Sequence, residues 1–272
     1  MTGDSGDGET PLRRILWPLA LVALLAGVIL LNNAAANWHY VVSGAPGALL
    51  YAASFDGGAA DGFNAEWEQY DGRLSAQIAD GALRLSDTGD PNGNPFSTIP
   101  LYFSDFDLQV VSRFALGPVG GSLDDGFGVI FRLQKKQSAS IDDDEFYLFQ
   151  ISNDGFYRVA RRLNGETIDL SAWIDTPIIN QGVEVENKLR VLARENEFSF
   201  YINDEQVLLC IPDDPEAKST YYSAFQECRG GSMRPTLIDS GIAYGQIGLV
   251  LSSSVDAPEV TAEFDNLLVY AP

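Results

Sequence analysis

Residues 145–166 read EFYLFQISNDGFYRVARRLNGE and contain two turn signals, Asp-Gly at 154–155 and Asn-Gly at 164–165. Asx-Gly pairs favour tight hairpin turns because the central positions of such turns have positive φ. Before the first pair, Tyr147 and Phe149 share one face of an alternating pattern, which is typical of a half-buried strand. The stretch therefore predicts two consecutive hairpins, and we expect most of its aromatic side chains to belong to a core.

The same alternation of apolar and polar residues continues through most of the chain beyond residue 48. Strands are expected at 49–55, 81–86, 106–114, 127–133, 146–151, 156–163, 188–195, 197–203, 206–211, 247–252 and 260–270. No stretch in this part of the chain has sustained helical periodicity. The predicted fold class is all-β, a two-sheet antiparallel jelly-roll sandwich formed by one domain over 49–272.

A long apolar segment precedes this domain. Residues 15–31 carry no charge, and as a helix they would be about 26 Å long, slightly short of a hydrocarbon core of about 30 Å. Small residues extend the segment, so we predict one N-terminal transmembrane helix over 15–36. Residues 37–48 are expected to form a juxtamembrane linker, in which Trp38 and Tyr40 suit the membrane interface.

The distribution of basic residues predicts the orientation of this segment. Arg13 and Arg14 precede it directly, and no Lys or Arg follows until Arg73. The positive-inside rule then makes 1–14 a short cytoplasmic tail and places the sandwich outside the cytoplasm, held by a single membrane pass. The alternative is a signal peptide cleaved after Ala36, which would release a secreted protein. Both interpretations export the domain.

The overall charge excludes some partners and some chemistry. The chain has 38 acidic and 17 basic residues, a net charge of -21, so we expect no nucleic acid partner. The single histidine, His39, cannot build a histidine-rich metal centre by itself. The expected partners are a carbohydrate or an extracytoplasmic protein, in addition to the membrane that the apolar segment would enter.

Residues 212–246 form the longest interruption of the strand pattern, and we treat them as an insertion in the sandwich. Cys210 and Cys228 bracket its first half, and an exported protein favours a disulfide between them. The aromatic residues of this segment, Tyr222 and Phe225 among them, are candidates for a partner or ligand surface.

The alternation of side chains between the two faces of each strand also suggests a site on one face of the sheet. Arg132, Gln150 and Arg158 each oppose the buried face of their strand, and Tyr157 and Trp173 lie nearby in the sequence. Saccharide sites combine an aromatic ring with planar polar groups, because C–H faces stack on rings while hydroxyl groups need directional bonds. These five residues form the predicted ligand-binding site. The alternative is an ordinary solvated sheet face that carries arginines.

Several segments together resemble a known group of proteins. They are DDGFGVIFR (124–132), EFYLFQISNDGFYRVARRLNGE (145–166), NKLRVLARENEFSFYINDEQV (187–207), GQIGLVLSS (245–253) and EFDNLLVY (263–270). In this order they resemble the concanavalin A-like (LamG-like) jelly-roll superfamily. The most similar members are the bacterial 3-keto-disaccharide hydrolase domains, which are related in fold to family 16 glycoside hydrolases. The resemblance covers about 50–272 and implies the fold, often with carbohydrate binding.

The family 16 resemblance also implies a catalytic pattern, Glu-x-Asp-x-x-Glu, which this chain matches only in part. Glu263 and Asp265 fit, but Leu268 replaces the second glutamate. Retaining glycosidases need two carboxyl groups, so the incomplete motif argues against this chemistry. Glu66 and Glu68 have strand-like spacing, but a solvated loop pair is the simpler interpretation. We therefore assign no catalytic residue.

A structural calcium is common in relatives of this superfamily. Asp56 near the start of the domain and Asp265 near its end are expected to lie close together, because the first and last strands of such sandwiches often pair. Two carboxylates with nearby carbonyls could contribute to the 6–8 oxygen ligands that Ca²⁺ takes. The alternative is two hydrogen-bonded turn aspartates.

Three functions remain open from the sequence. The first is a membrane-anchored, non-catalytic module that binds carbohydrate or protein. The second is a surface enzyme that acts on keto-disaccharides or a polysaccharide. The third is an accessory subunit of a membrane complex, with the insertion as its docking surface. The incomplete glutamate motif favours the first and third functions over the second.

Overall fold

The computed structural model describes residues 21–28, 39–57, 67–89, 93–116, 126–136, 143–215, 217–253 and 259–272. The chain divides into two compact units, 1–40 and 41–272. In the first unit, residues 21–28 are helical. Within the described ranges, no helix has both the length and the apolar character needed to span a bilayer. The predicted cytoplasmic tail (1–14) and most of the predicted anchor (15–36) lie outside the described residues.

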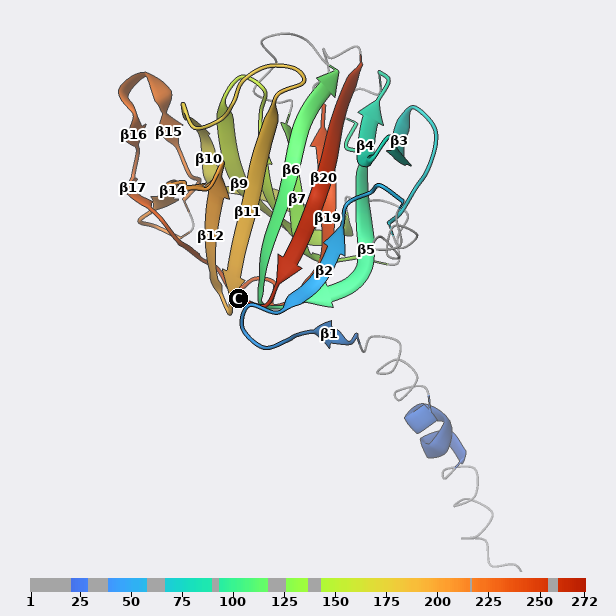
Figure 1. Ribbon diagram of the computed structural model, residues 1–272. Coiled ribbons are helices and arrows are strands. Elements are labelled where there is room, and N and C mark those ends of the chain that lie inside the picture. The colour runs from blue at the N-terminus through green and yellow to red at the C-terminus, as the bar shows by residue number, and fades with distance from the viewer. Residues whose placement is uncertain are drawn as a thin grey trace, which may run out of the picture. The chain divides into compact units, whose positions relative to one another are not determined.

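The second unit is a sandwich of two β-sheets (Figure 1). The seven-stranded sheet has the order β1 (Val41–Val42), β5 (Phe96–Phe103), β19 (Gly245–Ser252), β7 (Gly126–Gln134), β8 (Glu145–Ile151), β9 (Phe156–Leu163) and β10 (Glu166–Asp175). The main path of the nine-stranded sheet has the order β13 (Glu205–Gln206), β12 (Glu197–Ile202), β11 (Glu186–Arg194), β6 (Phe106–Leu116), β20 (Val260–Tyr270), β4 (Ala82–Asp87) and β3 (Leu74–Ala79). Two short strands complete it: β18 (Leu237–Ile238) pairs with β12, and β2 (Leu49–Ala53) pairs with β20.

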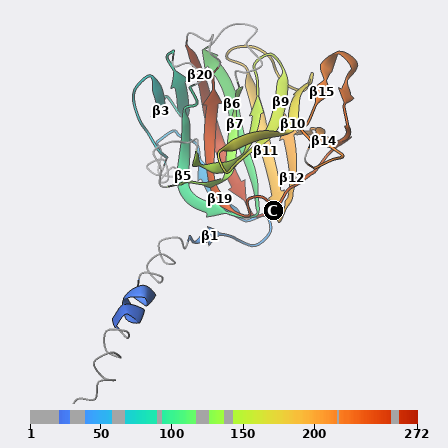
Figure 2. The same ribbon diagram turned by 180° about the vertical axis from the view of Figure 1, so that it is seen from behind.

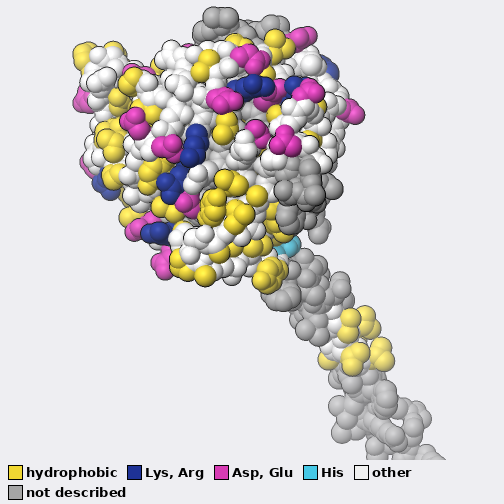
Figure 3. All heavy atoms as spheres, in the orientation of Figure 1, with side chains coloured by type: hydrophobic (Ala, Val, Ile, Leu, Met, Phe, Trp, Pro, Cys, Tyr) yellow, Lys and Arg dark blue, Asp and Glu magenta, His cyan; other side chains and the backbone are white. Residues whose placement is uncertain are grey.

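The two views show the sheets from opposite sides. Figure 1 has the nine-stranded sheet in front, and Figure 2 is seen from behind, where β10 of the seven-stranded sheet lies toward the viewer. On the outer face of the nine-stranded sheet, Lys and Arg side chains are interspersed among Asp and Glu (Figure 3). The jelly-roll prediction is confirmed, and so is the predicted pairing of the first and last strands of the domain, β2 and β20.

The stretch 145–166 forms the two expected hairpins, β8–β9 and β9–β10. At the second turn, Asn164 and Gly165 both have positive φ, 53° and 80°, as the tight turn requires. At the first turn only the glycine of the pair has positive φ, because β8 and β9 are joined by the four-residue loop 152–155.

The aromatic residues of this stretch lie in the core, as predicted. The Tyr147 ring stacks on Phe131 with centroids 5.3 Å apart, and it also lies 5.0 Å from Phe198 of the other sheet. The Phe149 ring likewise packs against Phe200 of the other sheet, with ring centroids 4.9 Å apart. Aromatic pairs at such distances contribute about 0.5–1.5 kcal/mol each beyond the burial of their area. These rings therefore join the two sheets.

Every predicted strand has a counterpart, although the strand expected at 206–211 is split into β13 and β14 (Leu209–Pro212). Among the described strands of six or more residues, three were not predicted: β3, β5 and β10. In β10 two register shifts interrupt the pairing with β9, so the period-two pattern is lost. In β5 the proline at position 100 argues against a strand that is paired on both sides.

The insertion lies along the edge of the sandwich beside β10. Its β14 pairs with β17 (Gly231–Arg234), and β15 (Tyr221–Tyr222) pairs with β16 (Glu227–Cys228). The backbone N–H of Cys210 donates to Ser171 Oγ of β10 at 3.1 Å, which ties β14 to the sheet. The predicted disulfide between Cys210 and Cys228 is confirmed, with Cα atoms 5.3 Å apart.

Candidate functional site

A hollow of about 210 Å³ opens on the outer face of the seven-stranded sheet. Its apolar residues come from β7, β8 and β19, where Ile130, Leu148 and Val250 are each less than a tenth exposed. The described residues that line it are Asn94, Ile130, Phe146, Leu148, Arg158, Arg162, Thr167, Val250 and Ser252. An apolar floor with a few polar groups around it is the usual composition of a small-molecule site.

One end of this face carries a stacked aromatic and guanidinium pair. The guanidinium carbon of Arg158 lies 4.8 Å from the centroid of the Trp173 ring. Arg158 Nε and Nη2 donate to Gln150 Oε1 at 3.0 and 2.9 Å, and Gln150 Nε2 donates to Ser252 Oγ at 2.8 Å. Side chains of three strands are therefore held in one hydrogen-bonded chain, with the indole ring of Trp173 lying against the guanidinium group.

A glycine makes room for this arrangement. A Cβ atom on Gly126 of β7 would lie 3.1 Å from Cη2 of Trp173 and 3.4 Å from Cδ of Gln150. The indole ring thus extends from β10 over the outer face as far as β7. Trp173 lies between two residues of β10, Ser171 and Ile174, whose register against β9 is shifted. Bulges of this kind change the direction in which the side chains of a strand point.

Three of the five predicted site residues are brought together here, namely Gln150, Arg158 and Trp173. Tyr157 is not among them. Because it precedes Arg158 in the same strand, it points to the opposite, inner face, where it is 3% exposed and its hydroxyl donates to the carbonyl of Leu208 at 2.6 Å. Burial raises the pKa of this phenol, so it stays protonated. The structure therefore does not bring Tyr157 to the hollow.

Arg132 does not lie on this face either, contrary to the strand parity. It lies at a bulge where the register of β7 and β8 shifts, and its φ of 52° turns the side chain out of the alternation. It is 1% exposed, and its guanidinium donates to the carbonyls of Ser104, Glu195 and Ile242 at 2.5–3.2 Å. The same group lies 4.7 Å from the Phe198 ring. Arg132 therefore ties loops at one end of the sandwich to the core.

We expect Arg132→Leu to lower the free energy of unfolding by on the order of 3 kcal/mol, because three backbone carbonyls lose the donor that the buried guanidinium supplies. Urea unfolding followed by tryptophan fluorescence measures the change. The matched control is Arg194→Leu at the exposed end of β11, with an expected loss below about 1 kcal/mol. Equal losses in the two variants would contradict the structural role of Arg132.

Sequence reasoning missed several members of the hollow. Arg162 shares the parity of Arg158, and this signal was available in the sequence. Thr167 reaches the site because β10 pairs with β9, where Arg162 Nη1 donates to Thr167 Oγ1 at 2.8 Å. Asn94 and Ser252 come from distant parts of the chain, and only the sheet order brings them to the same place.

The two predicted calcium ligands lie on the outer side of the other sheet. Asp265 accepts from the backbone N–H and side-chain amide of Asn266 at 2.6 and 2.8 Å. Asp56 Oδ1 lies beside Gly81, which together with Asp265 lines a small hollow of about 100 Å³. Over the described part of the chain, no three His, Cys, Asp or Glu side chains converge to hold a metal ion. The calcium site stays a prediction.

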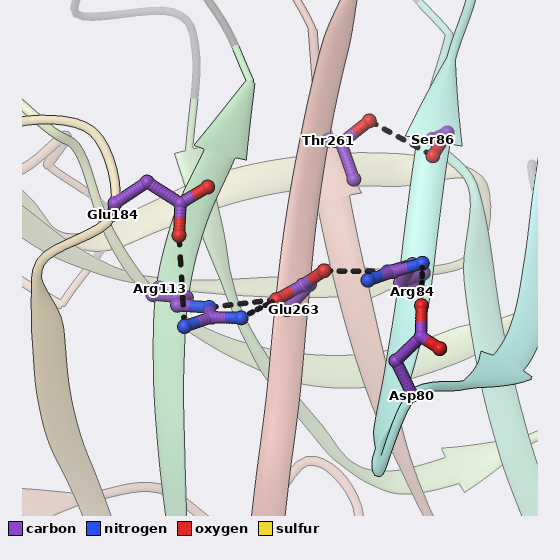
Figure 4. Close-up of polar contacts among 7 residues, drawn as sticks. All are labelled: Asp80, Arg84, Ser86, Arg113, Glu184, Thr261 and Glu263. Atoms are coloured by element: carbon purple, nitrogen blue, oxygen red, sulfur yellow. Dashed lines mark hydrogen bonds and ion pairs between the residues drawn. The ribbon is translucent and has the colours of Figure 1, made fainter.

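Glu263, the first residue of the incomplete glutamate motif, lies on the outer face of the nine-stranded sheet between two arginines (Figure 4). Arg84 Nε donates to its Oε1 at 2.5 Å, and Arg113 Nε donates to its Oε2 at 2.6 Å. Asp80 and Glu184 pair with the far sides of the same arginines. Burial opposes ionisation, but the two guanidinium groups outweigh it and hold the pKa of Glu263 below its ordinary value. A carboxyl group held ionised in this way is unsuited to act as a general acid.

This ion-pair network makes stability depend on pH. The ionised carboxylate stabilises the fold fully above the ordinary glutamate pKa of about 4.3, and the contribution is lost as pH falls through the lower pKa of the folded state. We therefore expect Glu263→Gln to unfold at lower urea concentration than the wild type at pH 7. The difference should shrink toward pH 3.

Glu197→Gln, at an exposed position of β12, is the control and should show little difference at either pH. A Glu263→Gln deficit that is independent of pH would contradict the lowered pKa.

Comparison with known proteins agrees with this architecture. Residues 51–269 match the family of the 3-keto-alpha-glucoside-1,2-lyase-like domain, and the chain belongs to this family. No curated protein matches the chain. The fold is that of the concanavalin A-like superfamily, as the sequence resemblance implied.

Solved structures share the fold at low sequence identity. A protein of unknown function with a galectin-like fold from Bacillus subtilis aligns with a TM-score of 0.54 and 12% identity, over 84% of this chain and 97% of its own. A beta-glucanase from Bacillus licheniformis aligns with a TM-score of 0.50 and 11% identity, over 83% and 99%. A carbohydrate-binding module from Bacillus subtilis has a TM-score of 0.48 and 18% identity, over 75% and 95%.

Proposed function

We propose that this protein binds a saccharide in the hollow on the outer face of the seven-stranded sheet. The observation that carries the proposal is the stacked pair of Trp173 and Arg158, held by Gln150 at the end of an apolar floor. Sugar rings have apolar C–H faces and hydroxyl edges. An indole ring beside a row of fixed hydrogen-bonding groups suits both kinds of surface.

We further propose that the domain works outside the cytoplasm, held by the apolar N-terminal segment or released after cleavage behind Ala36. The disulfide between Cys210 and Cys228 supports an oxidising environment. In this setting the exposed rings of Tyr222 and Phe225 in the insertion are the proposed contact for a protein partner. A structural Ca²⁺ at Asp56 and Asp265 remains part of the proposal.

The second candidate function is an enzyme that acts on keto-disaccharides or on a polysaccharide. The specific observation in its favour is membership of a family described by a lyase activity on 3-keto-glucosides. Incubation with a disaccharide oxidised at C3, followed by chromatography of the products, separates the two functions. Turnover by the wild type that is lost in Arg158→Gln supports the enzyme, whereas binding without turnover supports the binding module.

We expect Trp173→Ala to weaken saccharide binding by about tenfold, equivalent to about 1.4 kcal/mol, because the stacking surface is lost. The measurement is binding to an array of α- and β-linked glucosides, followed by titration calorimetry with the best ligand. Phe225→Ala is the control, because it removes an exposed ring that lies in the insertion. If the two variants bind as the wild type does, the hollow is not the site.

A further inference from the structure

A larger hollow, of about 580 Å³, lies at the edge of the seven-stranded sheet, where the insertion meets β10. Its described lining comes from β10 (166 and 168–170), from β14 and the loop after it (211–213, 215 and 217–218), and from β18 with the next residue (237–239). Arg161 and Arg234 complete it. Figure 2 shows β10 with β14 and β15 of the insertion beside it. We call this hollow the edge groove.

The backbone of β10 is open along part of the edge groove. β10 is the last strand in the order of its sheet, and β9 is the only strand that pairs with it in the described chain. The insertion covers its second half, where the N–H of Ala172 donates to Ser219 Oγ at 2.9 Å. Along 166–170, the backbone groups that point away from β9 have no hydrogen-bond partner among the described residues. Such an edge is a template on which a further strand can pair.

The side chains beside this open edge are mostly apolar. Ile168 and Leu170 share one face of β10, and Thr167 on the opposite face lines the saccharide hollow instead. Leu237, which is 4% exposed, and Ile238, which is 67% exposed, line the groove from β18. A strand added to this edge would cover these apolar groups with every second residue.

Most charged groups that line the edge groove already have partners. The ion pairs are Arg161 with Asp239, Arg234 with Asp213, and Arg158 with Asp169.

Two charged side chains remain, Glu166 and Lys218, and neither has an ion-pair partner in the described part of the chain. Glu166 begins β10, whereas Lys218 precedes Ser219, which is bonded to Ala172. The two positions are about 20 Å apart along the strand, because six residues separate Glu166 from Ala172. Opposite charges therefore mark the two ends of the groove.

We propose that the edge groove binds an extended peptide segment of a protein partner, which pairs with 166–170 of β10 as an additional antiparallel strand. The inward positions of the peptide are apolar. An acidic residue near its N-terminal end lies beside Lys218, and a basic residue near its C-terminal end lies beside Glu166. Antiparallel pairing is slightly more stable per residue than parallel pairing. In this mode of recognition backbone hydrogen bonds supply affinity and alternate side chains supply specificity.

The test measures binding of the full chain to two fluorescent peptides with blocked ends by anisotropy. The forward peptide is Glu-Thr-Val-Thr-Val-Thr-Lys, which places both charges and both valines on one face of a strand. The reversed peptide, Lys-Thr-Val-Thr-Val-Thr-Glu, has the same composition. We expect the forward peptide to bind about tenfold more tightly, because the reversed peptide brings like charges together at both ends of the groove.

A charge exchange in the protein locates the effect. The double variant Glu166→Lys with Lys218→Glu should reverse the preference, so that the reversed peptide binds about tenfold more tightly. Glu205→Lys is the matched control, because Glu205 is an exposed acidic residue on β13, the edge strand of the other sheet. This variant should keep the forward preference within about twofold of the wild type.

Backbone methylation tests the strand pairing itself. Alternate amide groups of an extended peptide point to its two opposite edges. Forward peptides that carry N-methyl groups on one alternate set or on the other should therefore differ. Methylation of the set that faces β10 should weaken binding at least about tenfold, and methylation of the other set should weaken it less than about threefold.

Several results would overturn this inference. They are failure of both peptides to bind at about 1 mM, equal binding of the two, and equal loss in the two methylated peptides. A dimer in analytical ultracentrifugation that Glu166→Lys dissociates would also overturn it, because a second copy of the chain would then occupy the edge. Saccharide binding on the outer face is a separate proposal, and the Trp173 variant tests it independently.

Discussion

The contact between the aromatic inner faces of the two sheets is the constraint on which this structure depends. Phe131 and Tyr147 of the seven-stranded sheet pack against Phe198 of the nine-stranded sheet, with ring centroids 5.0–5.5 Å apart. A strand that commits every second residue to this interface must present the others outward. The outer hollow is therefore a consequence of the core: Leu148 lines it because Tyr147 and Phe149 point inward.

Bulges decide the exceptions to this alternation, and two of them shape the candidate site. The bulge at Arg132 turns a guanidinium group away from the outer face and into the end of the sandwich, where three backbone carbonyls accept its hydrogen bonds. The register shifts in β10 lie on either side of Trp173, whose ring extends over the face as far as Gly126. The bulge in β7 thus removes the Arg132 guanidinium from the site, and the register shifts in β10 lie where Trp173 enters it.

Arginine side chains have different partners on the outer faces of the two sheets. On the nine-stranded sheet, Arg84 and Arg113 enclose Glu263, and a carboxylate that is 5% exposed keeps its charge because both of its oxygens are paired. On the seven-stranded sheet, Arg158 is held by an amide and an indole ring, and Arg162 by a hydroxyl group. The first arrangement stabilises the sheet. The second places two guanidinium groups beside an apolar floor.

The sequence by itself determined the all-β class, the hairpins of 145–166, the aromatic core and the pairing of Cys210 with Cys228. These features follow from period-two alternation, from Asx-Gly turns and from the count of cysteines, which are local or compositional signals. Only the tertiary structure decided which polar residues share a site. Parity counting placed Arg132 on the wrong face, because a single bulge reverses the face of a side chain, and nearness in the sequence did not bring Tyr157 to the face that carries Arg158. The sheet order, set by contacts between distant strands, brought Ser252 and Trp173 to Arg158.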